Sequence, residues 1–175
     1  MSNEMIDEEM NMMYGEGSKL KSLDSSTFQK PIKSIPFRTP VALSPEHTVA
    51  DAISEMQKKR IGCVLITEHG KMAGIFTERD VLLKVANKAG VEGKRLGELM
   101  TPKVSGFQKE DSIAFVLNAM HVGGYRHVPV VDEHNTPIAV ISVKDIISFI
   151  LEQFPEDILN LPPQPMRGTA EREGA

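Results

Sequence analysis

Two short stretches of the chain place a hydroxyl residue three positions before an aspartate, directly after an apolar run. Thr77 precedes Asp80 in "GIFTERDVL", and Ser142 precedes Asp145 in "AVISVKDII". A carboxylate can accept hydrogen bonds from two neighbouring hydroxyls, such as those of a ribose. The Thr or Ser hydroxyl and the free amides of a first helical turn can face an anion. The pattern therefore fits a nucleotide site.

The same residues also fit a structural role that needs no ligand. In a capping box the hydroxyl accepts an amide hydrogen of the first helical turn and the acid accepts one from the N-cap amide, which stabilises by about 1 kcal/mol. Three details favour a ligand. The acid is Asp rather than the usual Glu or Gln, a cation (Arg79 or Lys144) directly precedes it, and the preceding strand ends where α/β folds present ligands. One aspartate can serve both roles, so both interpretations stay open.

The elements that would position these aspartates occur twice. Thr48 and Ser112 stand 64 positions apart, each at a predicted helix start. Each is followed by apolar residues at the i, i+3, i+4, i+7 spacing of an amphipathic helix. These are Val49, Ala52, Ile53 and Met56 in the first copy and Ile113, Val116, Leu117 and Met120 in the second. The duplicated spacing predicts two related units.

Two β-rich runs follow each of these helices and lead into the aspartate motif. They are "CVLIT" and "MAGIF", then "HVPVV" and "PIAVI". A last apolar stripe closes each copy, with Val81, Leu82, Val85 and Ala86 in one and Ile146, Ile147, Ile150 and Leu151 in the other. A Thr-Pro pair and a short extended piece precede each copy. The sequence thus predicts an α/β fold in which two extended-helix-strand-strand-helix units pack as one domain.

Composition narrows the function classes. The 175 residues carry a net charge of −4, which disfavours nucleic acid as a partner. No apolar run approaches the ~20 residues of a membrane helix and the acidic start lacks the features of a secretory signal, so we expect no membrane insertion and a cytoplasmic location. No nucleophile is paired with a plausible base and no histidines keep metal-site spacing, so we expect no enzyme activity, no metal and no required cofactor. Cys63, the single cysteine, is expected to be a core residue.

The motifs "TERDVL", "SVKDII", "GELMTP" and above all "GYRHVPVVDEHNTPIAVIS" resemble the CBS-domain family, named from cystathionine β-synthase. The resemblance covers residues 35–153, and the first copy is the more divergent. Members usually carry two β-α-β-β-α repeats related by a pseudo-two-fold axis, with clefts between them. Their common ligands contain adenosine: AMP, ADP, ATP, S-adenosylmethionine and sometimes NAD. The resemblance implies this fold and an adenine nucleotide as a regulatory ligand.

Carried over to this sequence, the resemblance gives the motif residues roles. Asp80 and Asp145 would hold ribose hydroxyls, with Thr77 and Ser142 near ribose or phosphate. The extended segments 39–42 and 101–104 would border the adenine; their candidate ligand-binding residues are Thr39, Val41, Thr101 and Lys103. The charged or ionisable residues expected to face the ligand's anionic part are Arg79, Arg126, His127 and Lys144.

Arg126 and His127 directly precede the run "VPVV". Because neighbouring strand residues face opposite sides, at most one of them is expected to contact the ligand directly, and the fixed charge and forked geometry of arginine favour Arg126. At the 64-residue offset the first copy carries Gly62 and Cys63 instead. The two clefts are therefore expected to bind unequally.

We interpret the chain as a stand-alone regulatory module that binds an adenosine-containing ligand between its repeats and passes the ligand state to a partner. A homodimer is the expected assembly, and a regulated enzyme or transporter is the candidate partner. The alternative is a ligand-free dimerisation or protein-interaction module whose aspartates only cap helices. The predicted organisation is a flexible extension at 1–30, a first repeat at 31–90, a second repeat at 91–154 and a tail at 155–175.

Overall fold

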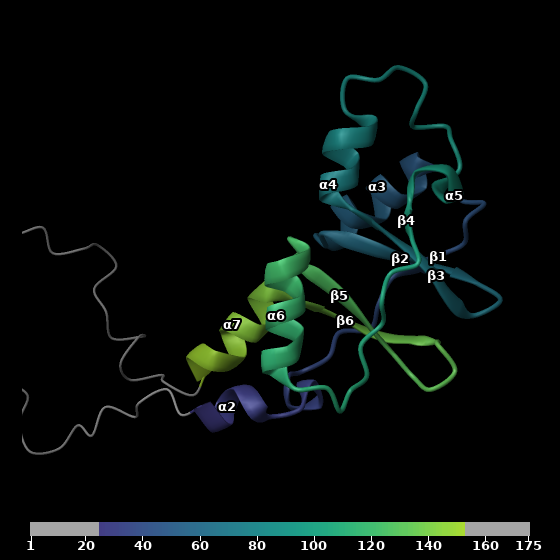
Figure 1. Cartoon of the computed structure of the whole chain (residues 1–175). Coiled ribbons are helices and arrows are strands. Elements are labelled where there is room, and N and C mark those ends of the chain that lie inside the picture. Colours follow the sequence, from purple (N-terminus) through teal and green to yellow (C-terminus); the bar gives the residue numbers. More distant parts are fainter. Residues whose placement is uncertain (1–24, 153–175) are drawn as a thin grey trace, which may run out of the picture.

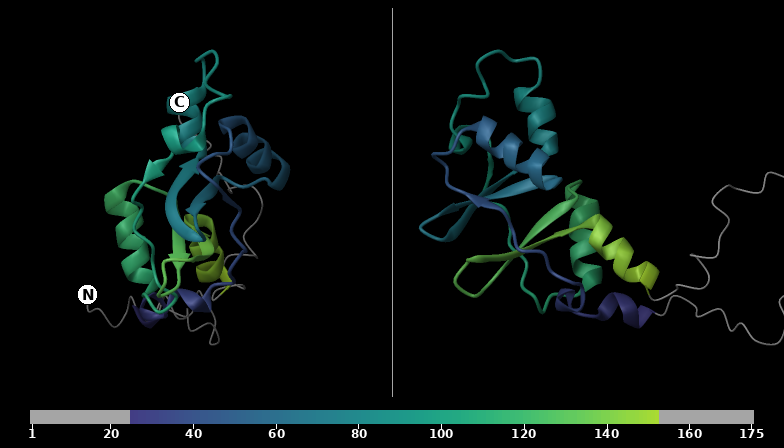
Figure 2. Two further views of the ribbon diagram at one scale, coloured as in Figure 1. Left: turned by 90° about the vertical axis from the view of Figure 1, so that its right-hand side faces the viewer. Right: turned by 180° about the vertical axis from the view of Figure 1, so that it is seen from behind.

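The structure, a computed structural model, describes residues 25–152 (Figure 1). The predicted extension before residue 25 and the predicted tail at 155–175 lie outside the described residues. Within the described part, two repeats of similar element order lie one above the other, and their strand hairpins extend towards the same side (Figures 1 and 2). No helix of the described part is long and apolar enough to cross a bilayer.

The first repeat follows the predicted order. Its elements are α3 (Val49–Lys59), β2 (Cys63–Glu68), β3 (Lys71–Thr77), α4 (Glu78–Asp80) and the π-helical turn η2 (Val81–Val85). Thr48 caps α3 as predicted, because its hydroxyl accepts from the amide of Asp51. The predicted stripe of α3 faces the core, where Val49 and Ala52 are fully buried. β2 and β3 pair antiparallel as a hairpin.

The second repeat repeats this pattern. It consists of α6 (Ile113–Gly123), β5 (His127–Val131), β6 (Pro137–Ser142) and α7 (Val143–Glu152). The Ser112 hydroxyl accepts from the amide of Phe115 (3.2 Å), and α6 ends at Gly124 in the left-handed conformation that glycine adopts without strain. Ile113 and Val116 pack on the antiparallel β5–β6 hairpin. The structure therefore has the predicted α/β architecture of two related β-α-β-β-α units.

The segment leading into each repeat packs on the other repeat. The helix α2 (Ser25–Gln29) and the turn η1 (Ile32–Ser34) precede the first repeat, yet Ile32 lies fully buried in the core of the second and its amide donates to the Asp111 carbonyl (2.8 Å). In the same way α5 (Leu96–Leu99) precedes the second repeat, and Leu96 is fully buried in the core of the first. This exchange ties the two repeats into one domain.

Two short strands flank the hairpin of the first repeat. β1 (Ala42–Leu43) runs parallel to β2 of its own repeat, whereas β4 (Thr101–Pro102), from the segment that leads into the second repeat, pairs antiparallel with β3. This gives a four-stranded sheet in the order β1-β2-β3-β4, with β4 as the exchanged strand. Gly74 permits the close approach of β4, since a Cβ there would lie 2.7 Å from the Thr101 carbonyl oxygen. The start of the second repeat is thereby held against the aspartate motif of the first.

The closing stripe of the first repeat differs from the prediction. Val85 is buried, but Leu82 is 70% exposed and Ala86 is also exposed. The helix widens here, with the Ala86 amide donating to the Val81 carbonyl (2.8 Å), so the 3.6-residue period assumed for the stripe does not apply. In α7, an ordinary α-helix, Ile147 from the predicted stripe is also 48% exposed. Apolar residues predicted for the core thus lie on the surface.

Candidate ligand-binding cleft

A cleft of about 390 Å³ lies between the two repeats, at the carboxyl end of β3. The first repeat lines it with Gly62, Ile75 and residues 77–80, and the second repeat lines it with residues 101–105 and 125–128. The exchanged strand β4 supplies one wall and the residues around the start of β5 supply another. The cleft therefore exists because two segments distant in sequence meet at the first aspartate motif.

Asp80 is the buried carboxylate of this cleft. Its Oδ2 accepts from the Thr77 amide (2.9 Å) and the Thr77 hydroxyl (2.8 Å), while its own amide donates to the Thr77 hydroxyl oxygen (3.3 Å). The structure thus contains the capping box that the sequence predicts as the ligand-independent role of this motif. Asp80 Oδ1 accepts from Lys84 Nζ (2.6 Å) and from the Thr101 hydroxyl (3.4 Å). The carboxylate is held in one orientation at the cleft wall.

Three cationic side chains line the same cleft. Arg79 Nη1 donates to the Gly124 carbonyl (2.6 Å), so this guanidinium joins the α4 turn to the end of α6 in the other repeat. Lys103 and Arg126 are exposed side chains on the second-repeat walls. An anionic group in the cleft would therefore meet fixed positive charge from both repeats.

His127 lies half-buried in the cleft, against Gly62. Burial lowers the pKa of His127, the nearby Glu78 carboxylate opposes that shift, and Arg126 acts with the burial. The sequence predicted that at most one of Arg126 and His127 would contact a ligand directly, because strand residues alternate. Both line the cleft, since β5 begins at His127 and Arg126 lies before it, where strand alternation does not apply.

The second aspartate motif forms the same box outside this cleft. Asp145 Oδ2 accepts from the Ser142 amide (2.8 Å) and the Ser142 hydroxyl (2.6 Å). Its Oδ1 meets Arg38 Nη2 at 3.7 Å. The predicted residues that do not line the 390 Å³ cleft are Thr39, Val41, Ser142, Lys144 and Asp145. Those that line it are Thr77, Arg79, Asp80, Thr101, Lys103, Arg126 and His127.

Sequence reasoning missed several residues of the cleft. Glu78 lines the cleft but is not among the predicted binding residues, although it stands inside the "TERD" motif. Tyr125 also lines the cleft without having been predicted, although it follows a glycine pair. That pair is the signal for Tyr125, because a Cβ at Gly123 would lie 2.0 Å from Cε1 of its ring. Lys84 gave no sequence signal of a site role, since a lysine in a helical stripe is usually a solvent-exposed side chain.

Comparison with known proteins identifies the family. The family model of the CBS domain matches residues 32–87 and 96–152. The chain therefore belongs to the CBS-domain family and carries two such domains in tandem.

Individual relatives agree with this assignment. The chain is 27% identical over 111 residues to a 17.7 kDa protein of Acidianus ambivalens, a match that covers 63% of this chain and 66% of that protein. It is 30% identical over 105 residues to the CBS domain-containing protein CBSCBSPB3 of Arabidopsis thaliana, which covers 59% of this chain but only 19% of the larger plant protein. The similarity to these relatives is thus confined to part of their length.

Among solved structures, the CBS domain pair of protein MJ0100 is similar in fold and sequence. It superposes with a TM-score of 0.61 at 27% identity, covering 67% of this chain and 97% of that one. That domain pair was solved in complex with 5′-methylthioadenosine and S-adenosyl-L-methionine.

Proposed function

We propose that this chain is a regulatory CBS-pair module that binds an adenosine-containing ligand between its repeats and modulates a partner protein. The observation that carries the proposal is one cleft lined both by the oriented carboxylate of Asp80 and by the cationic side chains of Lys103 and Arg126. A carboxylate suits ribose hydroxyls and the cations suit phosphate. The similar MJ0100 domain pair, which binds two adenosine compounds, supports this ligand class.

The residues of the cleft divide between the parts of such a ligand. Asp80 and Thr77 would hold the ribose, and the strand segment from Thr101 onward would border the adenine. Lys103, Arg126, Arg79 and His127 would face the anionic part. In this proposal the candidate ligands are AMP, ADP, ATP, S-adenosylmethionine and NAD, and each acts as a regulator rather than as a substrate.

Thermal unfolding with a panel of these compounds tests the proposal. A ligand present at about 100 times its dissociation constant adds about 2.7 kcal/mol to the free energy of unfolding. For a chain of this size, that raises the midpoint by roughly 5–10 °C. The full chain should show such a rise with at least one compound of the panel.

A matched pair of variants links the response to the cleft. Asp51 forms the same capping box with Thr48 as Asp80 forms with Thr77, but Asp51 lies on α3 and does not line the cleft. Asp80→Asn should abolish the ligand-induced rise in midpoint, and Asp51→Asn should keep it. A rise that survives Asp80→Asn would contradict the assignment of the site.

The output of the module would be a change in packing between the repeats. A ligand that contacts both repeats shifts the conformational equilibrium only by its differential affinity for the two states. We further propose that the module acts as a cytoplasmic homodimer, with an enzyme or a transporter as the regulated partner. Leu82, Leu83 and Val122, which are exposed on the helices, supply an apolar surface for that dimer.

One observation favours the alternative, a ligand-free dimerisation module. Both aspartates already complete capping boxes without any ligand. The thermal panel separates the two functions: a dimeric protein with no response to any adenosine compound would support the alternative.

A further inference from the structure

Lys84 connects the carboxylate of Asp80 to the segment that leads into β4. Its Nζ lies 2.6 Å from Asp80 Oδ1 and 2.6 Å from the carbonyl oxygen of Leu99. Leu99 ends α5, two residues before Thr101, which lines the cleft. A single ammonium group thus fixes both the aspartate of the first repeat and the entry to the exchanged strand β4.

The hydrogen bonds of Asp80 leave one contact that a ligand can replace. Each carboxylate oxygen accepts about two hydrogen bonds. Oδ2 is filled by the amide and the hydroxyl of Thr77, which belong to the capping box. Oδ1 holds Lys84 at 2.6 Å and the Thr101 hydroxyl at 3.4 Å. The Thr101 contact is long and its donor is uncharged, so it is the weaker of the two.

We propose that Lys84 is a positioning residue that makes the cleft selective for a ribose carrying its hydroxyls. Lys84 holds Asp80 Oδ1 towards the cleft, and a ribose hydroxyl takes the place of the Thr101 hydroxyl on that oxygen. This inference rests on the proposed function, because it specifies how the same site reads the sugar. Lys84 does not line the cleft and acts through Asp80.

The second repeat has no such arrangement. The position equivalent to Lys84 is Phe149, whose ring is buried in the second-repeat core. Asp145 Oδ1 instead meets Arg38, whose side chain is 76% exposed and whose Nη2 lies 3.7 Å away. The selectivity assigned to Lys84 therefore belongs to the cleft at Asp80 and not to the second motif.

The test compares two probes that differ only in the sugar. Dissociation constants of AMP and 2′,3′-dideoxy-AMP are measured by titration calorimetry for the full chain and its variants. The wild type should prefer AMP, because a site built to hydrogen-bond a hydroxyl binds the analogue without it more weakly. Lys84→Met should raise the dissociation constant of AMP by roughly tenfold or more and leave that of the dideoxy compound nearly unchanged. The ratio of the two constants should therefore move towards one.

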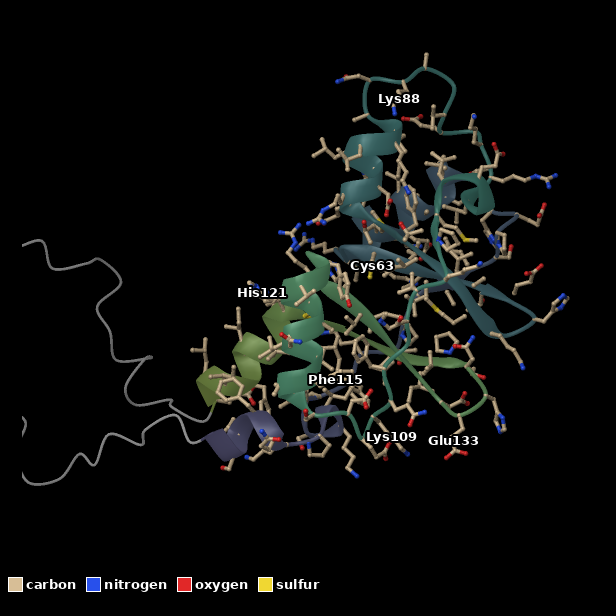
Figure 3. All side chains as sticks on the ribbon, in the orientation of Figure 1. Cys63, Lys88, Lys109, Phe115, His121 and Glu133 are labelled. Carbon is tan, nitrogen blue, oxygen red and sulfur yellow. The ribbon has the colours of Figure 1, made fainter. Side chains whose placement is uncertain are left out.

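Lys88→Met is the matched control. Lys88 follows η2, donates to the Leu83 carbonyl (2.9 Å) and lies in the loop beyond that helix (Figure 3). It does not line the cleft. The Lys88→Met variant should keep the wild-type preference for AMP over the dideoxy compound. If Lys84→Met does not fold, Lys84→Gln, which keeps a donor for Leu99 but removes the charge, is judged by the same ratio.

The outcomes separate this inference from the function on which it rests. A wild type that binds neither AMP nor any other compound of the adenosine panel overturns the proposed function. A wild type that prefers AMP, with a folded Lys84 variant that keeps the same preference, overturns the role of Lys84 alone. Equal weakening of both probes also overturns it, because a general loosening of the fold would act on both.

Discussion

The imidazole of His127 lies directly against Gly62. A Cβ at position 62 would be 2.8 Å from Cε1 and 2.8 Å from Nε2 of the ring, closer than real Cβ contacts come. Gly62 stands just before β2 of the first repeat and His127 begins β5 of the second. In the sequence, Gly62 stands out only because it lacks the polar side chain found at the equivalent position of the second repeat. In the structure, the absence of a side chain at Gly62 leaves the space that the His127 ring of the other repeat occupies.

Gly62→Ala should destabilise the protein. The added methyl group must displace the His127 ring, and overpacking of this kind costs about 1–3 kcal/mol. Urea unfolding measures the loss as a lower midpoint. Gly93→Ala is the control, because a Cβ there meets no atom within 4 Å. The contact is unimportant if both variants have the same midpoint.

A double variant assigns that loss to the pair. In His127→Ala the ring is gone, so adding Gly62→Ala should cost much less than it costs in the wild type. The difference between the two costs is the coupling free energy of the double-mutant cycle. A coupling near zero would mean that Gly62 is required for some other reason.

The half-buried His127 should make stability depend on pH. Burial lowers its pKa below the ordinary value of 6.5, against the opposing effects of Glu78 and Asp145. As the pH falls through 6.5 the unfolded chain binds a proton that the folded chain does not yet bind, so the free energy of unfolding decreases until the lower folded pKa is reached. His127→Gln should therefore lose less stability between about pH 7.5 and about pH 5.5 than the wild type. Equal losses in urea titrations would contradict this origin.

Cys63 should react slowly with thiol reagents in the folded protein. Cys63 lies on β2 of the first-repeat sheet (Figure 3). Its burial there, together with the Glu78 carboxylate, raises the pKa of its thiol to about 12, so little thiolate is present near neutral pH. Reaction with a chromogenic disulfide at about pH 8 should be slow in buffer and fast in concentrated urea. Because the chain has one cysteine, the signal has a single source. Similar rates in both conditions would show that the thiol is accessible.

The sequence predicted the features that depend on local spacing. Thr48 and Ser112 cap their helices, and the two "hydroxyl-x-x-Asp" stretches form boxes, because capping joins residues three positions apart. The duplicated spacing also predicted the order of helices and strands in each repeat. Asp80 lines the cleft as expected for a binding residue, and whether it binds ribose stays a prediction.

The exchange of leading segments could not be predicted in this way. Ile32 and Leu96 are ordinary apolar residues next to their own repeats in sequence, and each is fully buried in the core of the other repeat. Local periodicity indicates that such a residue is buried but not which core receives it, since that depends on long-range packing. The role of Lys84 was hidden for the same reason, because one of its two partners, the Leu99 carbonyl, lies 15 residues further along the chain in the segment that leads into the second repeat.

The surface around Leu82 should mediate the proposed dimer. Leu82 is 70% and Val122 is 77% exposed, and the hydrogen bond from Arg79 to Gly124 brings their two helices together. Apolar surface of this kind gains about 25 cal/mol per Å² when a second copy covers it. Leu82→Glu combined with Val122→Glu should convert the dimer to a folded monomer, measured by light scattering after gel filtration. Ile138 is an exposed apolar residue on β6, and Ile138→Glu should leave the dimer intact. A wild-type protein that elutes as a monomer would contradict the proposed dimer itself.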